Sequence, residues 1–383
     1  MSFRSRRGFM QGAAALPLAL RAMAQGNAHG ELLLVGTQTS GTSKGIYAYE
    51  LNAASGELRQ LGVAGEAANP TFLALAPNGK DVFAVNEIDS FADKNSGSLS
   101  AFRLDRVAAK LRLVNQVATG GGSPCHVAVD HTGTCVFVAN YVGGSAASFR
   151  LEEGGKLSKA VSLFQYRGSG PDKARQTSPH AHRVTVSPDN RFVMVNDLGL
   201  DVIHVYRLDP RTGVMTPNDP PTWKAAPGSG PRALQFHPNG RWAYCVTEMS
   251  STVYVLRWDA VGGILETVQE LAMLPQGYHG ETAGNDIVLD RAGRFAYASN
   301  RLDDFLATFD VAPEDGRLTL ARRSSCGGKT PRHLALDKTG RWLLVANQLS
   351  DNLAVFARDA TTGKLADAGK IFPLSRPQCV LFV

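Results

Sequence analysis

The chain has 383 residues, of which 44% are hydrophobic and 19% are charged. This balance excludes an intrinsically disordered protein, which combines low hydrophobicity with high charge, and five cysteines in this length exclude a small disulfide-stapled scaffold. The formal charge is +6, but four arginines lie within the first 24 residues, which hold no acid, so +2 remains for the rest. A near-neutral body without Lys/Arg clusters predicts no nucleic-acid partner.

Residues 1–24 have the features of an export signal. Arg6 and Arg7 precede Phe9, a short apolar run covers residues 12–20, and an A-x-A cleavage site ends at Ala24. Paired arginines before a weakly hydrophobic run predict a twin-arginine-type signal, with the export machinery as the partner of the precursor. We therefore expect a periplasmic mature chain that begins near residue 25 and does not associate with a membrane.

A repeat of about 50 residues organises the chain after residue 30. Each copy has a polar turn with Gly or Asn, followed by an apolar strand that ends in Asn or Thr. These closing residues are Asn86, Asn140, Asn196, Thr247, Asn300 and Asn347. Their spacings of 47 to 56 residues, with β-branched and aromatic runs between them, are typical of propeller blades.

Each repeat provides four predicted strands, bounded by Gly, Pro and Asn. Six such units begin at Asn69, Ser123, Ser178, Gly230, Ala283 and Thr330. Residues 32–38, 45–51 and 58–63 supply three further strands, and residues 377–383 supply one. We therefore predict an all-β fold, a seven-bladed β-propeller with four-stranded blades over residues 25–383. The C-terminal strand is expected to join the N-terminal blade, which closes the ring and removes open sheet edges.

One face of this propeller is expected to collect the chemistry. The first two strands of a blade are antiparallel, so the start of the first and the end of the second lie on the same face. The positions after the repeat Asn are Gln38, Glu87, Tyr141, Asp197, Glu248, Arg301 and Gln348. The first-strand positions include Asn69, Cys125, His126, His180, His182, Arg232, Asn285, Asp286, Arg332, His333 and Gln378. Convergent polar groups of such different kinds predict a binding or catalytic site.

Some of these residues have plainer interpretations. Gln38, Tyr141 and Gln348 are equally consistent with packing at the rim. His180 and His182 have the spacing of metal ligands, but no third ligand lies nearby in the sequence, so we predict no metal.

Several segments, in order, closely resemble the lactonase-family propellers, the group that holds bacterial 6-phosphogluconolactonase and fungal carboxymuconate-lactonizing enzyme. The resembling segments are residues 69–87, 124–141, 178–182, 230–248, 298–301, 331–348 and 378–383. The resemblance covers about residues 31–383 and implies seven blades with the site on one face. Three local departures, Ala233, Thr247 and the loop 302–304, put the substrate in doubt more than the fold.

The resemblance also implies site residues. The catalytic set proposed for the family matches His182, Arg232, Glu248 and Arg301 of this chain. Around it we predict seven substrate-binding residues: Glu87, His126, Tyr141, His180, Asp197, Arg332 and Gln348.

These residue types suit the opening of a lactone. Glu248 or His182 can act as base or acid, if burial brings its pKa near the working pH. Arg232 and Arg301 can hold the oxyanion, or a carboxylate or phosphate of the substrate, so no metal or other cofactor is required.

The predicted export and the resemblance conflict over the substrate. Cytoplasmic relatives act on 6-phosphogluconolactone, which an exported enzyme would rarely meet, so we expect hydrolysis of an unphosphorylated sugar lactone. Two alternatives remain: a non-catalytic periplasmic binding propeller and a muconate-type cycloisomerase, because this scaffold hosts many functions.

Overall fold

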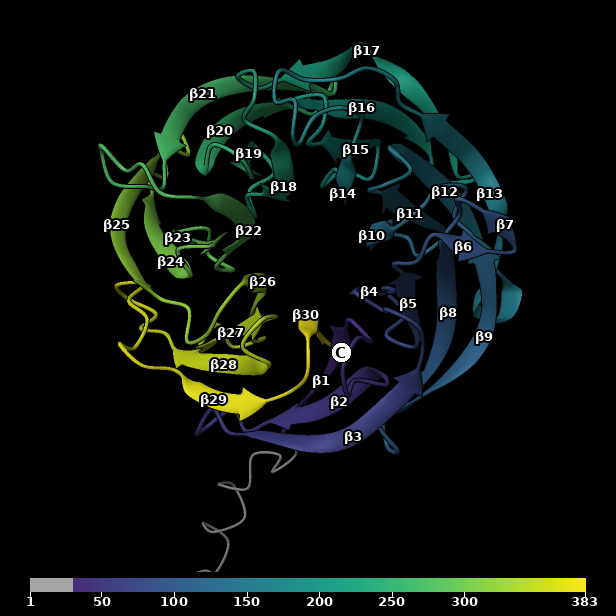
Figure 1. Ribbon diagram of the computed structural model, residues 1–383, viewed down its shortest axis with the longest axis horizontal. Coiled ribbons are helices and arrows are strands. Elements are labelled where there is room, and N and C mark those ends of the chain that lie inside the picture. Colours follow the sequence, from purple (N-terminus) through teal and green to yellow (C-terminus); the bar gives the residue numbers. More distant parts are fainter. Residues whose placement is uncertain (1–29) are drawn as a thin grey trace, which may run out of the picture. The chain divides into compact units, whose positions relative to one another are not determined.

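Short apolar runs bounded by Gly, Asn and Pro form seven four-stranded antiparallel sheets in the computed structural model. The structure describes residues 30–383, apart from the side chains of residues 93 and 94. The sheets are the blades of a ring, and the innermost strand of each blade faces the centre of the ring (Figure 1). This innermost strand is the first strand of its blade in six blades and the C-terminal strand of the chain in the remaining one. The predicted export signal lies outside the described residues.

The blades are numbered here in chain order. Blade 1 contains β1 (Glu31–Thr37), β2 (Gly45–Leu51), β3 (Leu58–Glu66) and β30 (Pro377–Phe382). Blade 2 contains β4 (Phe72–Leu75), β5 (Asp81–Asn86), β8 (Ser98–Asp105) and β9 (Lys110–Ala118). Blade 3 contains β10 (Pro124–Val129), β11 (Cys135–Asn140), β12 (Ser145–Glu152) and β13 (Lys156–Gln165). Blade 4 contains β14 (Ala181–Val186), β15 (Phe192–Asp197), β16 (Val202–Asp209) and β17 (Val214–Lys224).

The other three blades follow the same order. Blade 5 contains β18 (Pro231–Phe236), β19 (Trp242–Thr247), β20 (Thr252–Asp259) and β21 (Ile264–Ala272). Blade 6 contains β22 (Ala283–Leu289), β23 (Phe295–Arg301), β24 (Phe305–Val311) and β25 (Leu318–Ser325). Blade 7 contains β26 (Pro331–Leu336), β27 (Trp342–Asn347), β28 (Asn352–Ala357) and β29 (Lys370–Pro373).

Both ends of the propeller sequence meet in blade 1. The C-terminal β30 pairs antiparallel with β1, with Val35 opposite Val380 and Leu34 opposite Leu381. In Figure 1 the yellow C-terminal strand lies beside the purple β1. This arrangement confirms the predicted seven blades and the predicted closure of the ring.

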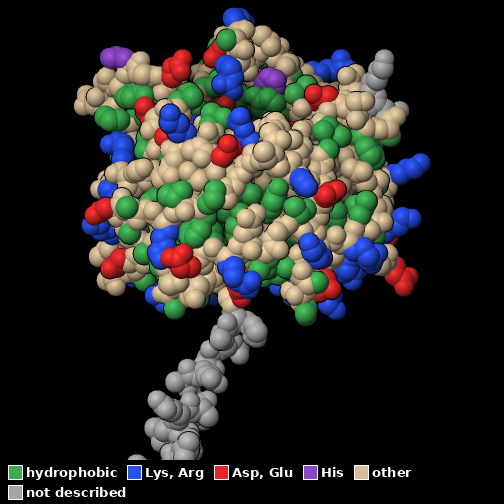
Figure 2. Space-filling model, turned by 60° about the horizontal axis from the view of Figure 1, so that its bottom comes forward, with side chains coloured by type: hydrophobic (Ala, Val, Ile, Leu, Met, Phe, Trp, Pro, Cys, Tyr) green, Lys and Arg blue, Asp and Glu red, His purple; other side chains and the backbone are tan. Residues whose placement is uncertain are grey.

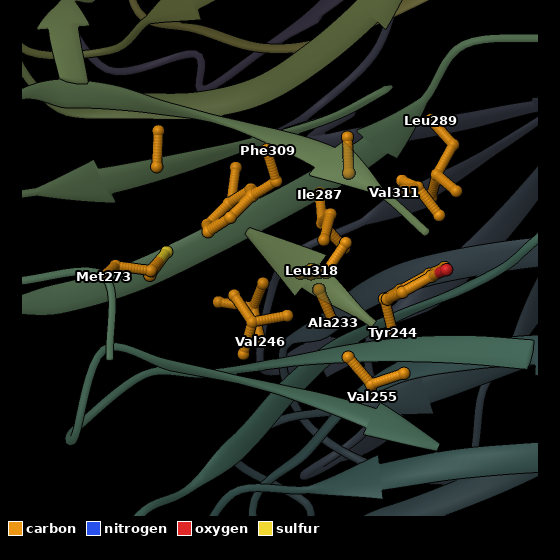
Figure 3. Close-up of a cluster of buried hydrophobic side chains, with 14 of the residues drawn as sticks. Ala233, Tyr244, Val246, Val255, Met273, Ile287, Leu289, Phe309, Val311 and Leu318 are labelled. Atoms are coloured by element: carbon orange, nitrogen blue, oxygen red, sulfur yellow. The ribbon is translucent and has the colours of Figure 1, made fainter. Parts of the chain in front are cut away.

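Apolar side chains between neighbouring blades form the core. Figure 3 shows one such cluster, between blades 5 and 6, in which Tyr244, Val246 and Val255 face Ile287 and Phe309. These five side chains have 0 to 1% of their surface exposed. Burial of apolar surface on both faces of each sheet holds the blades in fixed positions around the site.

A few elements lie outside the repeat. A two-stranded hairpin, β6 (Ser90–Phe91) with β7 (Asp93–Lys94), extends the β5–β8 connection, and one 3-10 turn covers Glu153–Gly155.

Within residues 30–383 no helix is long and apolar enough to span a membrane. All five cysteines are buried free thiols. The side of the molecule in Figure 2 carries interspersed basic and acidic side chains.

Candidate functional site

A β-bulge recurs near the start of the inner strand in six of the seven blades. At this point the pairing with the second strand skips a residue, for example between Ala181 and Arg183 of blade 4. The skipped residues are Cys125, His182, Arg232, Asn285 with Asp286, Arg332 and Gln378. A bulge re-aims the side chain of its extra residue. The same irregularity therefore presents His182, Arg232 and Arg332 to the centre of the ring.

A cavity at the centre brings five of the predicted residues together. Its lining includes Glu87, His126, His182, Arg232 and Arg332. Glu248 and Arg301 are not part of this lining; Glu248 directly contacts both Arg232 and Arg301. The four predicted catalytic residues thus form one cluster, with Arg232 as the link between the cavity and Glu248.

Glu248 follows the second strand of blade 5 and binds two arginines through one oxygen. Its Oε2 accepts from Arg232 Nε at 2.8 Å and lies 2.7 Å from Arg301 Nη2. Glu248 and Arg232 are each only 4% exposed. Arg232 also donates from Nη1 to the carbonyl oxygen of Asn285 at 2.6 Å, which fixes its guanidinium plane.

The charges of this cluster decide its protonation. Burial alone would raise the pKa of Glu248, but Arg301, Arg232 and Arg175 outweigh it and lower that pKa to about 2. Burial and the cationic Arg301 lower the pKa of Arg232, and Glu248 opposes this shift. We expected burial to bring the pKa of Glu248 or of His182 near the working pH; at Glu248 the arginines lower the pKa instead, and Glu248 is a carboxylate at neutral pH.

Arg175 is one site residue that the sequence did not reveal. It lies in the connection from blade 3 to blade 4, outside the repeat, and its Nη2 donates to the other oxygen of Glu248, Oε1. Asp172 accepts from the backbone N–H of Ala174 and Arg175, and the buried Gln176 donates to the carbonyl of Leu198. These hydrogen bonds fix the turn that places Arg175 against Glu248. The repeat pattern does not predict this position of Arg175.

His182 presents a neutral imidazole to the cavity. Burial and the cationic Arg232, Arg332 and Arg301 hold the pKa of His182 well below its usual value of 6.5. Within residues 30–383 no hydrogen bond is formed by its ring nitrogens. Tyr141 lies edge-on to it, with ring centroids 5.7 Å apart. The imidazole is thus uncharged and open to a water molecule or a substrate.

Three of the predicted substrate-binding residues form hydrogen bonds within the protein through their side-chain polar atoms. Asp197 is fully buried and accepts from the backbone N–H groups of His180, Gly199 and Leu200. His180 stacks on Tyr141 at 4.5 Å, and its Nδ1 lies 3.2 Å from the Tyr141 carbonyl oxygen. Gln348 donates to Gln38 at 2.9 Å. The structure therefore places these side chains around the cavity, where they support its wall, and not in its lining.

Among the described residues, no three His, Cys, Asp or Glu side chains converge as metal ligands. The cluster instead concentrates guanidinium groups. Arg332 donates through Nε to Gln378 at 2.9 Å, which leaves its terminal nitrogens directed to the cavity. The arrangement can bind an anion or a developing negative charge on oxygen.

Comparisons with known proteins agree with this geometry. The model of the family described as "Lactonase, 7-bladed beta-propeller" matches residues 32–382. A 6-phosphogluconolactonase of Bacillus subtilis is 33% identical over 349 residues, 91% of this chain and 97% of that protein. A 6-phosphogluconolactonase of Formosa agariphila is 34% identical over 325 residues, 84% of this chain and 90% of that protein.

A solved structure supports the same relationship. The periplasmic gluconolactonase of Pseudomonas aeruginosa superposes with a TM-score of 0.87 at 35% identity, covering 92% of this chain and 99% of that one. The fold, the sequence motifs and the extent of these matches all indicate the same family. The chain therefore belongs to the seven-bladed β-propeller lactonase family.

Proposed function

We propose that this protein hydrolyses a sugar lactone without a metal ion, at the cluster formed by His182, Arg232, Glu248 and Arg301. The observation that carries the proposal is the open neutral imidazole of His182 beside the buried guanidinium of Arg232 in one cavity. The names of the relatives, 6-phosphogluconolactonase and periplasmic gluconolactonase, support the reaction class.

In this proposal His182 is the general base. It takes a proton from a water molecule while the water oxygen attacks the lactone carbonyl carbon. The bond between that carbon and the ring oxygen then breaks, and the ring oxygen receives the proton from the His182 imidazolium. One water is consumed and one aldonic acid is formed, which loses its carboxyl proton to solvent.

Arg232, which lines the cavity, stabilises the carbonyl oxygen as its negative charge grows, and Arg301 adds positive charge beside it. Their guanidinium groups are held in place before the substrate arrives, because both bind the same oxygen of Glu248. Fixed donors need no reorganisation during the reaction. Glu248 in this proposal is the anchor of the two arginines and not the base.

The substrate that we favour is an unphosphorylated aldonolactone in the periplasm. The predicted export signal in residues 1–24 supports this location. The name of the Pseudomonas aeruginosa relative, a periplasmic gluconolactonase, supports both the location and the absence of a phosphate.

The test is the hydrolysis of glucono-1,5-lactone, with and without a 6-phosphate, by the mature chain in the presence of a chelator. We expect turnover above the spontaneous rate for the wild type and loss of turnover in Glu248→Gln. Glu266→Gln, which removes an exposed partner of Arg257, is the control and should behave as the wild type. Faster turnover of the phosphorylated lactone would overturn the substrate preference, and no turnover of either would favour a binding protein.

A further inference from the structure

An ion pair crosses the centre of the ring at the bottom of the cavity. Arg183 of blade 4 donates from Nη1 to Asp286 Oδ1 of blade 6 at 2.7 Å, which spans the intervening blade 5. The side chains are 15% and 4% exposed. The second oxygen of Asp286 accepts from the backbone N–H of Leu334 at 3.0 Å and lies 3.8 Å from His333 Nε2.

Three rings complete this floor layer, which consists of Phe72, His126, Arg183, Asp286 and His333. Phe72 packs on His126 with ring centroids 4.1 Å apart and lies edge-on to His333 at 5.2 Å. Beneath the layer is a second cavity with a mainly apolar lining, and Phe72, His126, Arg183 and His333 border both. The floor layer therefore separates a polar chamber from an apolar one.

The floor layer holds hydrogen-bonding groups that the protein does not use. Among the described residues, Arg183 Nε and Nη2 have no hydrogen-bond acceptor. His126 Nδ1 accepts from the backbone N–H of Val184 at 3.4 Å, so the neutral ring carries its proton on Nε2, which has no acceptor either. These donors are not sealed from solvent, because none of them belongs to the buried unpartnered polar atoms of the described residues. They are accessible at the wall of the cavity, where oxygen atoms of a ligand can accept from them.

We infer that the floor layer binds hydroxyl groups of the lactone and selects polyhydroxylated lactones over plain ones. This inference rests on the proposed function and extends it to residues with no part in the bond-breaking steps. A hydroxyl group both donates and accepts, which matches a layer with guanidinium and imidazole donors next to the Asp286 carboxylate.

The experiment compares kcat/KM for glucono-1,5-lactone with that for δ-valerolactone, the same six-membered lactone without hydroxyl groups. The wild type should prefer the hydroxylated lactone by at least about 100-fold, because unpaired site groups penalise a ligand that lacks its hydroxyls. The double variant Arg183→Met/Asp286→Asn removes both charges together, since loss of one partner alone leaves a buried unpaired charge. We expect the preference to fall at least about tenfold in this variant.

A second buried ion pair supplies the matched control. Arg358 and Asp290 are 3% and 5% exposed, with Nη2 and Oδ2 2.8 Å apart, and neither lines the cavity. Arg358→Met/Asp290→Asn should keep the wild-type preference even if stability falls. An unchanged preference in the Arg183/Asp286 variant, with the same ratio as the control, would overturn the inference.

Two further outcomes keep the test decisive if the first double variant does not fold. The wild type alone, assayed with lactones that lack single hydroxyl groups, should lose kcat/KM with each deletion, and an absence of any preference would refute the inference. The conservative Arg183→Lys variant should shift the same ratio, because lysine has no planar fork of donors. Lack of turnover of every lactone by the wild type would instead refute the proposed function itself, and the inference with it.

Discussion

The carboxylate of Glu248 allows two guanidinium groups to lie side by side in a buried place. Arg232 and Arg301 would repel each other there, but both contact the same oxygen of Glu248. Arg175 adds a third positive charge on the other oxygen. The arginines lower the pKa of both groups, so at neutral pH Glu248 is a carboxylate and His182 is an uncharged imidazole. The proposed function makes His182 the base and Glu248 the anchor of the arginines.

Replacement of His182 by Gln tests this division of roles. We expect kcat to fall about 100-fold or more, the usual contribution of a general base. Since the pKa of His182 is held below 6.5, the wild-type kcat/KM should stay level down to pH 6.5 and decline only at lower pH, as the imidazole gains a proton. His237→Gln is the control, because His237 binds the Gly293 carbonyl at 2.9 Å outside the cavity. A profile that declines above pH 6.5, or activity retained in His182→Gln, would contradict the assignment.

Glu248 should also make the fold sensitive to acid. Its pKa is 4.5 ordinarily and about 2 in the folded chain, so the folded state binds fewer protons between these values. The stabilisation, on the order of 3 kcal/mol, is complete above pH 4.5 and is lost as the pH falls towards 2. Glu248→Gln should therefore unfold at lower urea concentration at pH 7 and show a shallower loss of stability between pH 5 and 2. Equal acid sensitivity in Glu248→Gln and in the exposed control Glu266→Gln would be evidence against this account.

At the scale of the strands, the repeat explains what could be predicted and what could not. Its spacing located the blades, and the antiparallel order of the first two strands placed His182, Arg232 and Glu248 on one face. The repeat gave no indication that the Asp197 carboxylate accepts from backbone N–H groups, because these hydrogen bonds depend on the conformation of the turn. It gave no sign of Arg175 either, since Arg175 lies between β13 and β14 in a connection that the repeat does not include.

The pairing across the ring was equally hidden from the sequence. Asp286 stood among the first-strand positions expected on the site face, but its partner Arg183 did not. The two belong to blades that are not neighbours, and only the closed ring brings their bulges together. Contacts of this kind depend on the curvature of the whole sheet arrangement and not on local spacing.

Gly199 offers a test of how a turn positions the inner strand of blade 4. A Cβ at Gly199 would lie 2.0 Å from the carbonyl oxygen of Ser178 and 2.9 Å from the backbone nitrogen of His180. Gly199→Ala must displace the segment that leads into His182, so we expect kcat to fall together with some loss of thermal stability. Gly65→Ala is the control, on the outer strand β3, where the nearest atoms to the Cβ belong to the side chains of Leu111 at 3.2 Å and Phe102 at 3.8 Å. Full activity of Gly199→Ala would show that this turn does not set the position of His182.

At the scale of the whole molecule, the site exists only in a closed ring. The bulged residues that face the centre come from six blades, and Gln378, which holds Arg332, belongs to the C-terminal strand. The backbone pairing of β30 with β1 joins the two ends of the chain within one sheet. Opening the ring at blade 1 therefore requires the rupture of a hydrogen-bonded ladder as well as the packing between blades.

The pairing of β30 with β1 is called the clasp here. Circular permutation can test its contribution to stability separately from the rest of the fold. The backbone N–H of Val383 donates to the Leu32 carbonyl at 3.0 Å, so a short linker can join Val383 to Glu31. A permutant that begins at Ser375 makes every blade from continuous chain, so that packing and side-chain hydrogen bonds, but no shared sheet, join blades 7 and 1. A permutant cut between Gly154 and Gly155 carries the same linker but moves the clasp to blade 3, whose β12 and β13 would then come from opposite ends.

Both permutants should keep lactone turnover, because neither cut touches the cavity. The permutant that begins at Ser375 should unfold in denaturant about tenfold faster, the factor that corresponds to 1.4 kcal/mol of lost barrier. Stopped-flow unfolding of the two permutants and of residues 31–383 in native order measures this directly. Equal unfolding rates for the clasped and unclasped permutants would mean that packing between blades alone keeps the ring shut, and that the pairing of β30 with β1 contributes only the inner wall of blade 1.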